Sequence, residues 1–172
     1  MGNIAKKTRF IFLFILMLGS IAIACNTSAQ PQYVVVTTTP ISAILEAPDG
    51  KIGNEVSTND FKLTVISVEE AASFGEDVPK TGNKYVAVEV EIENRKDNYD
   101  VNPIYARLQD SNGNVYALIF GGKDPYLEPS YGISKGTRVK GWITYEVSEE
   151  AREFLFIYEP WMSTEKAIIS LK

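Results

Sequence analysis

The chain has 172 residues, a formal net charge of −5, no histidine and a single cysteine, Cys25. Without histidine, the usual Ser-His-Asp and Cys-His catalytic groups and the common zinc sites are excluded. The acidic balance disfavours nucleic acid as a partner, because both molecules carry negative charge.

The N-terminus has the order of a secretory signal peptide, which we place at residues 1–24. Basic residues up to Arg9 precede an uninterrupted apolar stretch, Phe10–Leu18, and a run of small and apolar residues. The sequence Ala22-Ile23-Ala24-Cys25 resembles a bacterial lipobox, in which the cysteine becomes the first mature residue and its sulfur carries a diacylglycerol. We therefore expect an exported lipoprotein, anchored by acyl chains such as palmitate in the cell membrane or an outer membrane.

Two other interpretations of the leader remain open. Ala22-x-Ala24 also suits ordinary signal cleavage, which would release a soluble protein. An uncleaved anchor is the other alternative, but the apolar core Phe10–Ala24 has 15 residues, whereas a spanning helix needs about 20. The position of the lone cysteine at the cleavage boundary favours the lipoprotein.

Residues 25–54 have the composition of a tether that carries the lipid at Cys25. Thr, Ser, Gln and Pro are frequent, and Pro48-Asp49-Gly50 is a turn signal. The run Tyr33–Thr39 is β-prone, so whether it adds an edge strand stays open. The leader holds three of the 17 basic residues and none of the 22 acidic ones, which leaves a net charge of −8 on the rest of the chain.

Residues 55–172 alternate short strand-like runs with turn residues. In the clearest run, Tyr85–Glu93, valine and isoleucine alternate with alanine and glutamate, the period of a half-buried strand. We therefore expect Val88 and Val90 to face the core and Glu89 to face solvent. Six further runs predict strands: Phe61–Val68, Ile104–Gln109, Val115–Phe120, Thr137–Val147, Phe154–Tyr158 and Ala167–Leu171.

Helix is nearly absent from this pattern. Only Ser148–Glu153 predicts a helical turn, with Ser148 as its cap. About seven short strands with almost no helix predict an all-β fold, an immunoglobulin-like antiparallel β-sandwich in a single domain over residues 55–172.

Four segments also resemble a known family: Lys84–Asn94, Leu108–Tyr116, Gly136–Val147 and Phe154–Pro160. The chain resembles a large uncharacterised family of bacterial extracellular domains that are sometimes mislabelled as telomeric repeat-binding factors. The resemblance covers roughly residues 55–172. It implies an immunoglobulin-like fold similar to a secreted mycobacterial immunogenic antigen and a location outside the cytoplasm. It implies no activity and no functional residues.

Two acidic segments are candidate chemical sites. Glu89, Glu91 and Glu93 share one strand face, and paired carboxylates can hydrolyse glycosides when they face each other across a cleft. A solvated acidic face is the favoured interpretation. Asp110–Asn114 has the oxygen-rich composition of a calcium loop, but its glycine stands at the fourth position and no glutamate follows at the twelfth. A β-hairpin turn explains this segment, and no metal is expected.

Aromatic residues gather outside the predicted strands, at Tyr99, Phe120, Tyr126, Tyr131 and Trp161. Tyr126 and Tyr131 belong to the longest irregular segment after the tether, Gly121–Lys135. These rings form either a contact surface or a cover over the open end of the sandwich. Trp142 lies one residue off the inward-facing set of its strand, so we expect it to face outward.

The sequence leaves two functions open. The first is a non-enzymatic, lipid-anchored module that binds a protein or glycan partner, with Tyr126, Tyr131 and Trp142 as candidate contacts. The second is an exported carboxylate-dependent hydrolase. Neither interpretation calls for a cofactor. A hydrolase needs a cleft with two carboxylates pointing into it, whereas a binding module needs an aromatic surface.

The lipid anchor is tested by the substitution Cys25→Ser, which removes the thiol that would carry the acyl chains. We expect the variant to take up no fatty-acid label and to remain unprocessed or be cut after Ala24. Labelling with a palmitate analogue and partition between detergent and aqueous phases measure this, because several acyl chains give stable membrane retention. A wild-type protein that takes up no label and stays in the aqueous phase contradicts the prediction.

Overall fold

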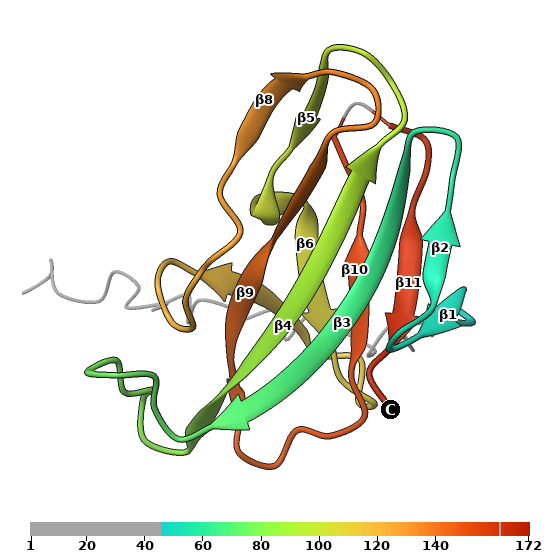
Figure 1. Ribbon diagram of the computed structural model, residues 1–172. Helices are drawn as coiled ribbons and strands as arrows, with labels where there is room; N and C mark the ends of the chain where they lie inside the picture. The colour runs from blue at the N-terminus through green and yellow to red at the C-terminus, as the bar shows by residue number, and fades with distance from the viewer. Residues whose placement is uncertain (1–45, 162) are drawn as a thin grey trace, which may run out of the picture. The chain divides into compact units, whose positions relative to one another are not determined.

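The computed structural model describes residues 46–161 and 163–172, so the predicted leader, Cys25 and the Tyr33–Thr39 run lie outside the described residues. Strands dominate the described part (Figure 1), and all seven predicted strands are present. Within these residues no helix is long and apolar enough to span a membrane. The elements are β1 (Gly50–Lys51), β2 (Glu55–Ser57), β3 (Phe61–Ala71), β4 (Asn83–Asn94), β5 (Tyr99–Val101), η1 (Pro103–Tyr105), β6 (Ala106–Gln109), β7 (Val115–Ile119), β8 (Ser130–Ile133), β9 (Arg138–Ser148), β10 (Leu155–Tyr158) and β11 (Ala167–Ser170).

The strands form a two-layered β-sandwich, which confirms the predicted fold class. The hydrogen-bonded order is β1-β11-β10-β6-β7-β9-β4-β3-β2. In Figure 1, β9, β4 and β3 form the front layer, and β6, β10 and β11 lie behind them. Strand β7 joins the layers, because its first half pairs with β6 and its last two residues, Leu118 and Ile119, pair with β9. At the opposite edge β1 is parallel to β11 and β2 is antiparallel to β3.

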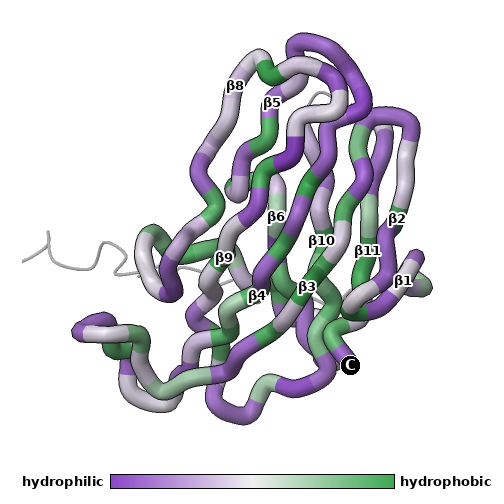
Figure 2. The backbone as a smooth tube through the Cα atoms, in the orientation of Figure 1, coloured by the Kyte–Doolittle hydropathy of each residue, from purple (hydrophilic) through white to green (hydrophobic). Residues whose placement is uncertain are grey.

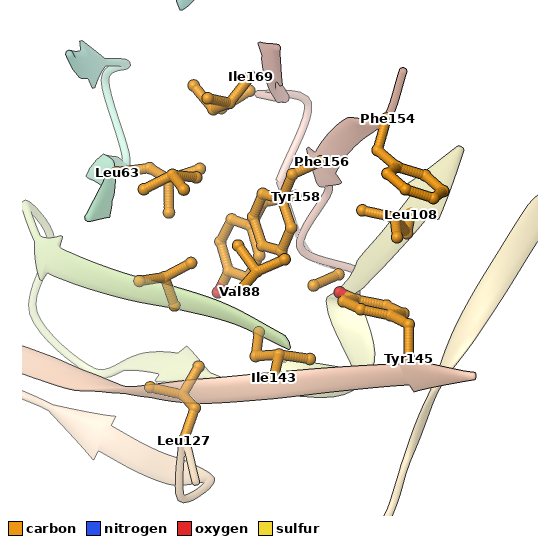
Figure 3. Close-up of a cluster of buried hydrophobic side chains, with 14 of the residues drawn as sticks. Leu63, Val88, Leu108, Leu127, Ile143, Tyr145, Phe154, Phe156, Tyr158 and Ile169 are labelled. Carbon is orange, nitrogen blue, oxygen red and sulfur yellow. The ribbon is translucent and has the colours of Figure 1, made fainter. Parts of the chain in front are cut away.

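Strand β4 shows why the layers pack. Val86, Val88, Val90 and Ile92 are fully buried, as the alternation predicted, and Figure 2 shows apolar and polar residues taking turns along this strand. Large apolar side chains from both layers meet in the interior (Figure 3), among them Leu63, Leu108, Phe156 and Ile169. The burial of this apolar surface is the main stabilising contribution in a domain whose described part contains no cysteine.

The outer face of β4 is acidic, as expected, and cations from the neighbouring strands line it. Glu89 accepts a hydrogen bond from Ser67 at 2.9 Å and pairs with Lys140 at 3.1 Å. Arg138 pairs with both Glu91 and Glu93, at 3.3 and 2.5 Å. Cross-strand pairs of opposite charge add a few tenths of a kcal/mol to about 1 kcal/mol each. The three glutamates therefore pair with cations of a neighbouring strand and do not face one another across a cleft.

The structure adds elements that the sequence pattern did not predict. Gly50–Lys51, placed in the tether, forms β1 and pairs with Ile169 and Ser170, so the end of the predicted tether belongs to the fold. Part of the segment expected to be irregular forms β8, which pairs with β5. The predicted helical turn at Ser148–Glu153 is instead a tight turn, in which the amide of Ala151 donates to the carbonyl of Ser148 at 3.0 Å. The following residues leave this turn toward β10 before a helix can form.

The inward register of β4 is tested with Val88→Ala. We expect it to lower the free energy of unfolding by about 1–3 kcal/mol, because it removes buried methyl groups and leaves a cavity. The matched variant Glu91→Ala lies on the outer face, where the side chain is 36% exposed, and should cost less than about 1 kcal/mol. Denaturant melts measure both values, and comparable losses would show that the strand register is wrong.

Candidate binding site

The three aromatic residues singled out from the sequence, Tyr126, Tyr131 and Trp142, line one cavity of about 530 Å³. They come from different segments: Tyr126 precedes β8, Tyr131 lies in β8, and Trp142 lies in β9. The remaining lining residues belong to the turn before β6, the end of β7, the segment before β8, and β9: Asn102, Pro103, Ile104, Leu118, Ile119, Phe120, Gly121, Leu127, Glu128, Pro129, Ile143 and Thr144.

Tyr126 is positioned by backbone pairing to β9. The amide of Trp142 donates to the carbonyl of Pro125 at 2.9 Å, and the amide of Leu127 donates to the carbonyl of Trp142 at 2.8 Å. Leu127 is only 2% exposed and enters the core beside Ile143 (Figure 3). Because neighbouring side chains of an extended segment point to opposite sides, burial of Leu127 turns Tyr126 outward, where it is 50% exposed.

A close backbone approach makes this arrangement possible. A Cβ atom on Gly141 would lie 2.6 Å from the backbone of Leu127, which no side chain can tolerate without a shift. Glycine at this position therefore lets the segment before β8 pair with the edge of β9 beyond the residues that pair with β7.

Tyr131 is held over the turn that precedes β6. Its hydroxyl accepts a hydrogen bond from Nδ2 of Asn102 at 3.2 Å, and Oδ1 of Asn102 accepts one from the amide of Ile104 at 3.1 Å. The buried Asn102 thus caps η1 and ties β8 to it. As a result the exposed Ile104 and Tyr131 both border the cavity.

Trp142 faces outward from its strand, as expected, but its indole is half-buried. Gly141 and Ile143, its neighbours on β9, are both buried. The ammonium group of Lys123 lies 4.1 Å from the Trp142 ring centroid and also pairs with Glu69. This cation–π contact covers part of the ring, so Trp142 contributes to the cavity wall and is not a freely exposed anchor.

Exposed apolar side chains concentrate around this cavity. Eight large hydrophobic residues are exposed among the described residues, and four of them line the cavity: Ile104, Phe120, Tyr126 and Tyr131. Phe120 is 92% exposed. A fifth, Trp161, lines an adjoining hollow of about 340 Å³ that shares Ile104 with the cavity. Such clustering on one face is typical of an interaction surface, whereas single exposed apolar residues are ordinary.

Ile104 is the rim residue that the sequence analysis missed, because the strand alternation assigned it to a strand. Pro103, which directly precedes it, and Asn102, which caps the turn, are the signals that could have marked this position as irregular.

The cavity contains one carboxylate among its lining residues, that of Glu128. Glu128 raises the pKa of Tyr126 through hydrogen bonding and charge. Glu89, Glu91 and Glu93 do not line the cavity. The arrangement can therefore hold a ligand by apolar contact and one negative charge, and it does not present a pair of facing carboxylates.

The Asp110–Asn114 segment closes the β6–β7 turn. Asp110 is 1% exposed, and its carboxylate accepts hydrogen bonds at 2.9 Å from the amides of Asn112 and Asn114, the side chain of Asn114 and the hydroxyl of Tyr116. Burial pushes the pKa of Asp110 upward, but these hydrogen bonds outweigh it and hold the pKa below its usual value. Protein donors thus occupy both carboxylate oxygens and stabilise the turn.

Comparison with known families identifies the chain. The family described as "Domain of unknown function (DUF4352)" matches residues 50–168. The chain belongs to this family. No curated protein matches it. The expected membership of an uncharacterised family is thereby confirmed, and the matched range includes β1 and ends within β11.

Three solved structures are similar to this DUF4352 chain in fold. YjhA of Bacillus subtilis is 19% identical with a TM-score of 0.59, over 72% of this chain and 99% of that one. YcdA, a predicted lipoprotein of Bacillus subtilis, is 15% identical with a TM-score of 0.57; the match covers 69% of this chain but only 38% of YcdA. MPT63, a secreted protein of Mycobacterium tuberculosis, is 13% identical with a TM-score of 0.53, over 74% and 98% of the two chains. At these identities the likeness establishes the fold.

The role of Asp110 is tested with Asp110→Asn. The amide would place donors against the donors of Asn114 and Tyr116, so we expect a loss of about 1–3 kcal/mol in unfolding free energy at pH 7. Because folding lowers the pKa of Asp110, this contribution is present above the unfolded pKa of about 4 and is lost as the pH falls through the folded value. In urea melts, the difference in unfolding free energy between wild type and Asp110→Asn should therefore be smaller at pH 3 than at pH 7.

The exposed Glu76 provides the control for this experiment, as Glu76→Gln should leave stability unchanged at both pH values. A gap between wild type and Asp110→Asn that is the same at pH 7 and pH 3 would show that the carboxylate charge contributes nothing to the turn.

Proposed function

We propose that this DUF4352 protein is an exported, lipid-anchored module that binds a partner at the aromatic cavity and performs no catalysis. The observation that carries the proposal is the convergence of exposed aromatic and apolar side chains from separate segments on one cavity. A folded domain gains nothing in stability from a ring such as Phe120 that stays in water, whereas an interface gains strongly from aromatic anchors.

The support for binding is physical. The cavity has the size and the predominantly apolar lining of ligand sites, with a few polar groups at Asn102, Thr144 and Glu128. Hydrogen bonds to β9 and η1 hold its walls in place before a partner arrives. Such preorganisation lowers the entropic cost of association.

The support for the location is the leader. The signal-like residues 1–24 and the lipobox-like sequence ending at Cys25 call for export and lipid attachment. Similarity in fold to a predicted lipoprotein and to a secreted protein is consistent with a place outside the cytoplasm. The acidic chain makes nucleic acid an unsuitable partner.

The alternative, a carboxylate-dependent hydrolase, finds no support in this cavity. Glycoside hydrolysis needs two carboxyl groups about 5–10 Å apart on either side of the bond. Among the residues that line the cavity, Glu128 alone carries a carboxylate.

The proposal is tested with Tyr126→Ala and Tyr131→Ala. Each should weaken partner retention by at least about 1 kcal/mol, because an aromatic anchor provides a large share of the binding energy. Tyr126→Ala should change stability little, since Tyr126 is 50% exposed. Tyr131→Ala should cost about 1 kcal/mol, because it also removes the hydrogen bond from the buried Asn102. Quantitative pull-down from envelope extract measures retention, and thermal melts measure stability.

Val78→Ala serves as the matched control, because Val78 is 71% exposed and does not line the cavity. It should leave both retention and melting temperature unchanged. The opposite result for the tyrosine variants, a large drop in melting temperature with retention intact, would show that the two rings close the sandwich and bind nothing.

A further inference from the structure

The cavity combines aromatic faces with one negative charge. Glu128 is its one carboxylate, and the lining residues, all in the described part of the chain, include neither lysine nor arginine. The nearby Lys123 is engaged by Glu69 and by the Trp142 ring. Aromatic faces and a carboxylate both attract cations, and the net charge of −8 on the chain without its leader adds to the attraction.

A second hollow shares the lining residue Ile104 with the cavity, so two hollows lie next to each other on the surface. Ile104, which is 59% exposed, lies between the two. The lining of the second hollow includes Trp161, which is 87% exposed. Its charged residues, Arg107 and Glu159, pair with each other at 2.7 Å, so this hollow offers apolar contact with no net charge.

We infer that the occupant of this surface is an extended segment of a partner protein, in which an arginine or lysine enters the cavity and an apolar side chain packs beside Trp161. The inference rests on the proposed function and specifies its partner. The cation contacts the aromatic walls and pairs with Glu128, while the side chain two residues along, which points to the same side of an extended segment, covers Ile104 and Trp161.

A polypeptide fits both hollows better than a small organic cation does. A small cation would fill the first hollow and leave Trp161 in water, whereas alternate side chains of an extended polypeptide point to the same side and can reach both hollows. Opposite charge on the partner also speeds encounter and disfavours acidic competitors.

The two tryptophans of the chain provide one reporter for each hollow. The full-length protein, held in detergent micelles and labelled with 5-fluorotryptophan, gives two fluorine signals that Trp142→Phe and Trp161→Phe assign. The ligands are short capped peptide pools with apolar flanking residues and a fixed central arginine, citrulline or glutamate. Citrulline preserves the shape of arginine but carries no charge.

We expect the arginine pool to shift both signals and to bind about tenfold more tightly than the citrulline pool. Glu128→Gln should remove most of this preference, whereas Glu150→Gln should leave it intact, because Glu150 is exposed and does not line the cavity. The double-mutant comparison separates the charge interaction from general binding. Raised salt should weaken the arginine pool selectively.

Three outcomes overturn the inference. Equal affinity of the arginine and citrulline pools would show that the surface binds peptides without a preference for a cation. The inference would then be wrong, while the proposed function would stand. Tetramethylammonium that binds as tightly as the arginine pool, with a shift at Trp142 alone, shows a small-cation site. If millimolar peptide shifts neither fluorine signal, an extended peptide segment is not the occupant. The pull-down with the tyrosine variants then tests the proposed function separately.

Discussion

The edge of β9 is the constraint on which both the sandwich and the cavity depend. One edge of β9 pairs with β4 from Arg138 to Ser148. The other edge is shared, first by the end of β7 at Thr144 and Tyr145 and then by the segment around Tyr126. A β-strand edge left unpaired in this position would expose backbone donors and acceptors to an apolar surface, which is costly. The segment around Tyr126 therefore completes the sheet along β9, and the cavity forms at this edge.

This arrangement explains why a rigid core and an exposed aromatic surface lie side by side. Leu127 and Ile143 belong to the core, while Tyr126 and Trp142, one residue away in each segment, point to the other side. Each hydrogen bond that holds Leu127 in place also fixes Tyr126. The backbone around Tyr126 is consequently tied to the core strand β9, and a wall held in this way lowers the entropic cost of binding.

Charge is organised in two ways on the same domain. On the outer face of β4, glutamates meet lysine and arginine from neighbouring strands, as in the pair of Glu89 with Lys140. At the cavity, Glu128 carries a charge with no cation among the lining residues. The difference separates carboxylates that pair with a cation of a neighbouring strand from one whose neighbour is the Tyr126 hydroxyl, a distinction that the sequence could not make because cross-strand neighbours are distant along the chain.

The sequence by itself determined the fold class and the seven main strands, because burial on one face of a strand imposes a two-residue period that Tyr85–Glu93 shows directly. It could not determine β1, which has two residues, or β8, where Gly132 has a φ of +59° and its amide donates to Asp100. Only the tertiary structure decided that Tyr126, Tyr131 and Trp142 share a cavity and that Ile104 borders it. The physical reason is that this site depends on which segment pairs with the free edge of β9. That pairing is non-local and depends on the absence of a side chain at Gly141, which no periodicity records.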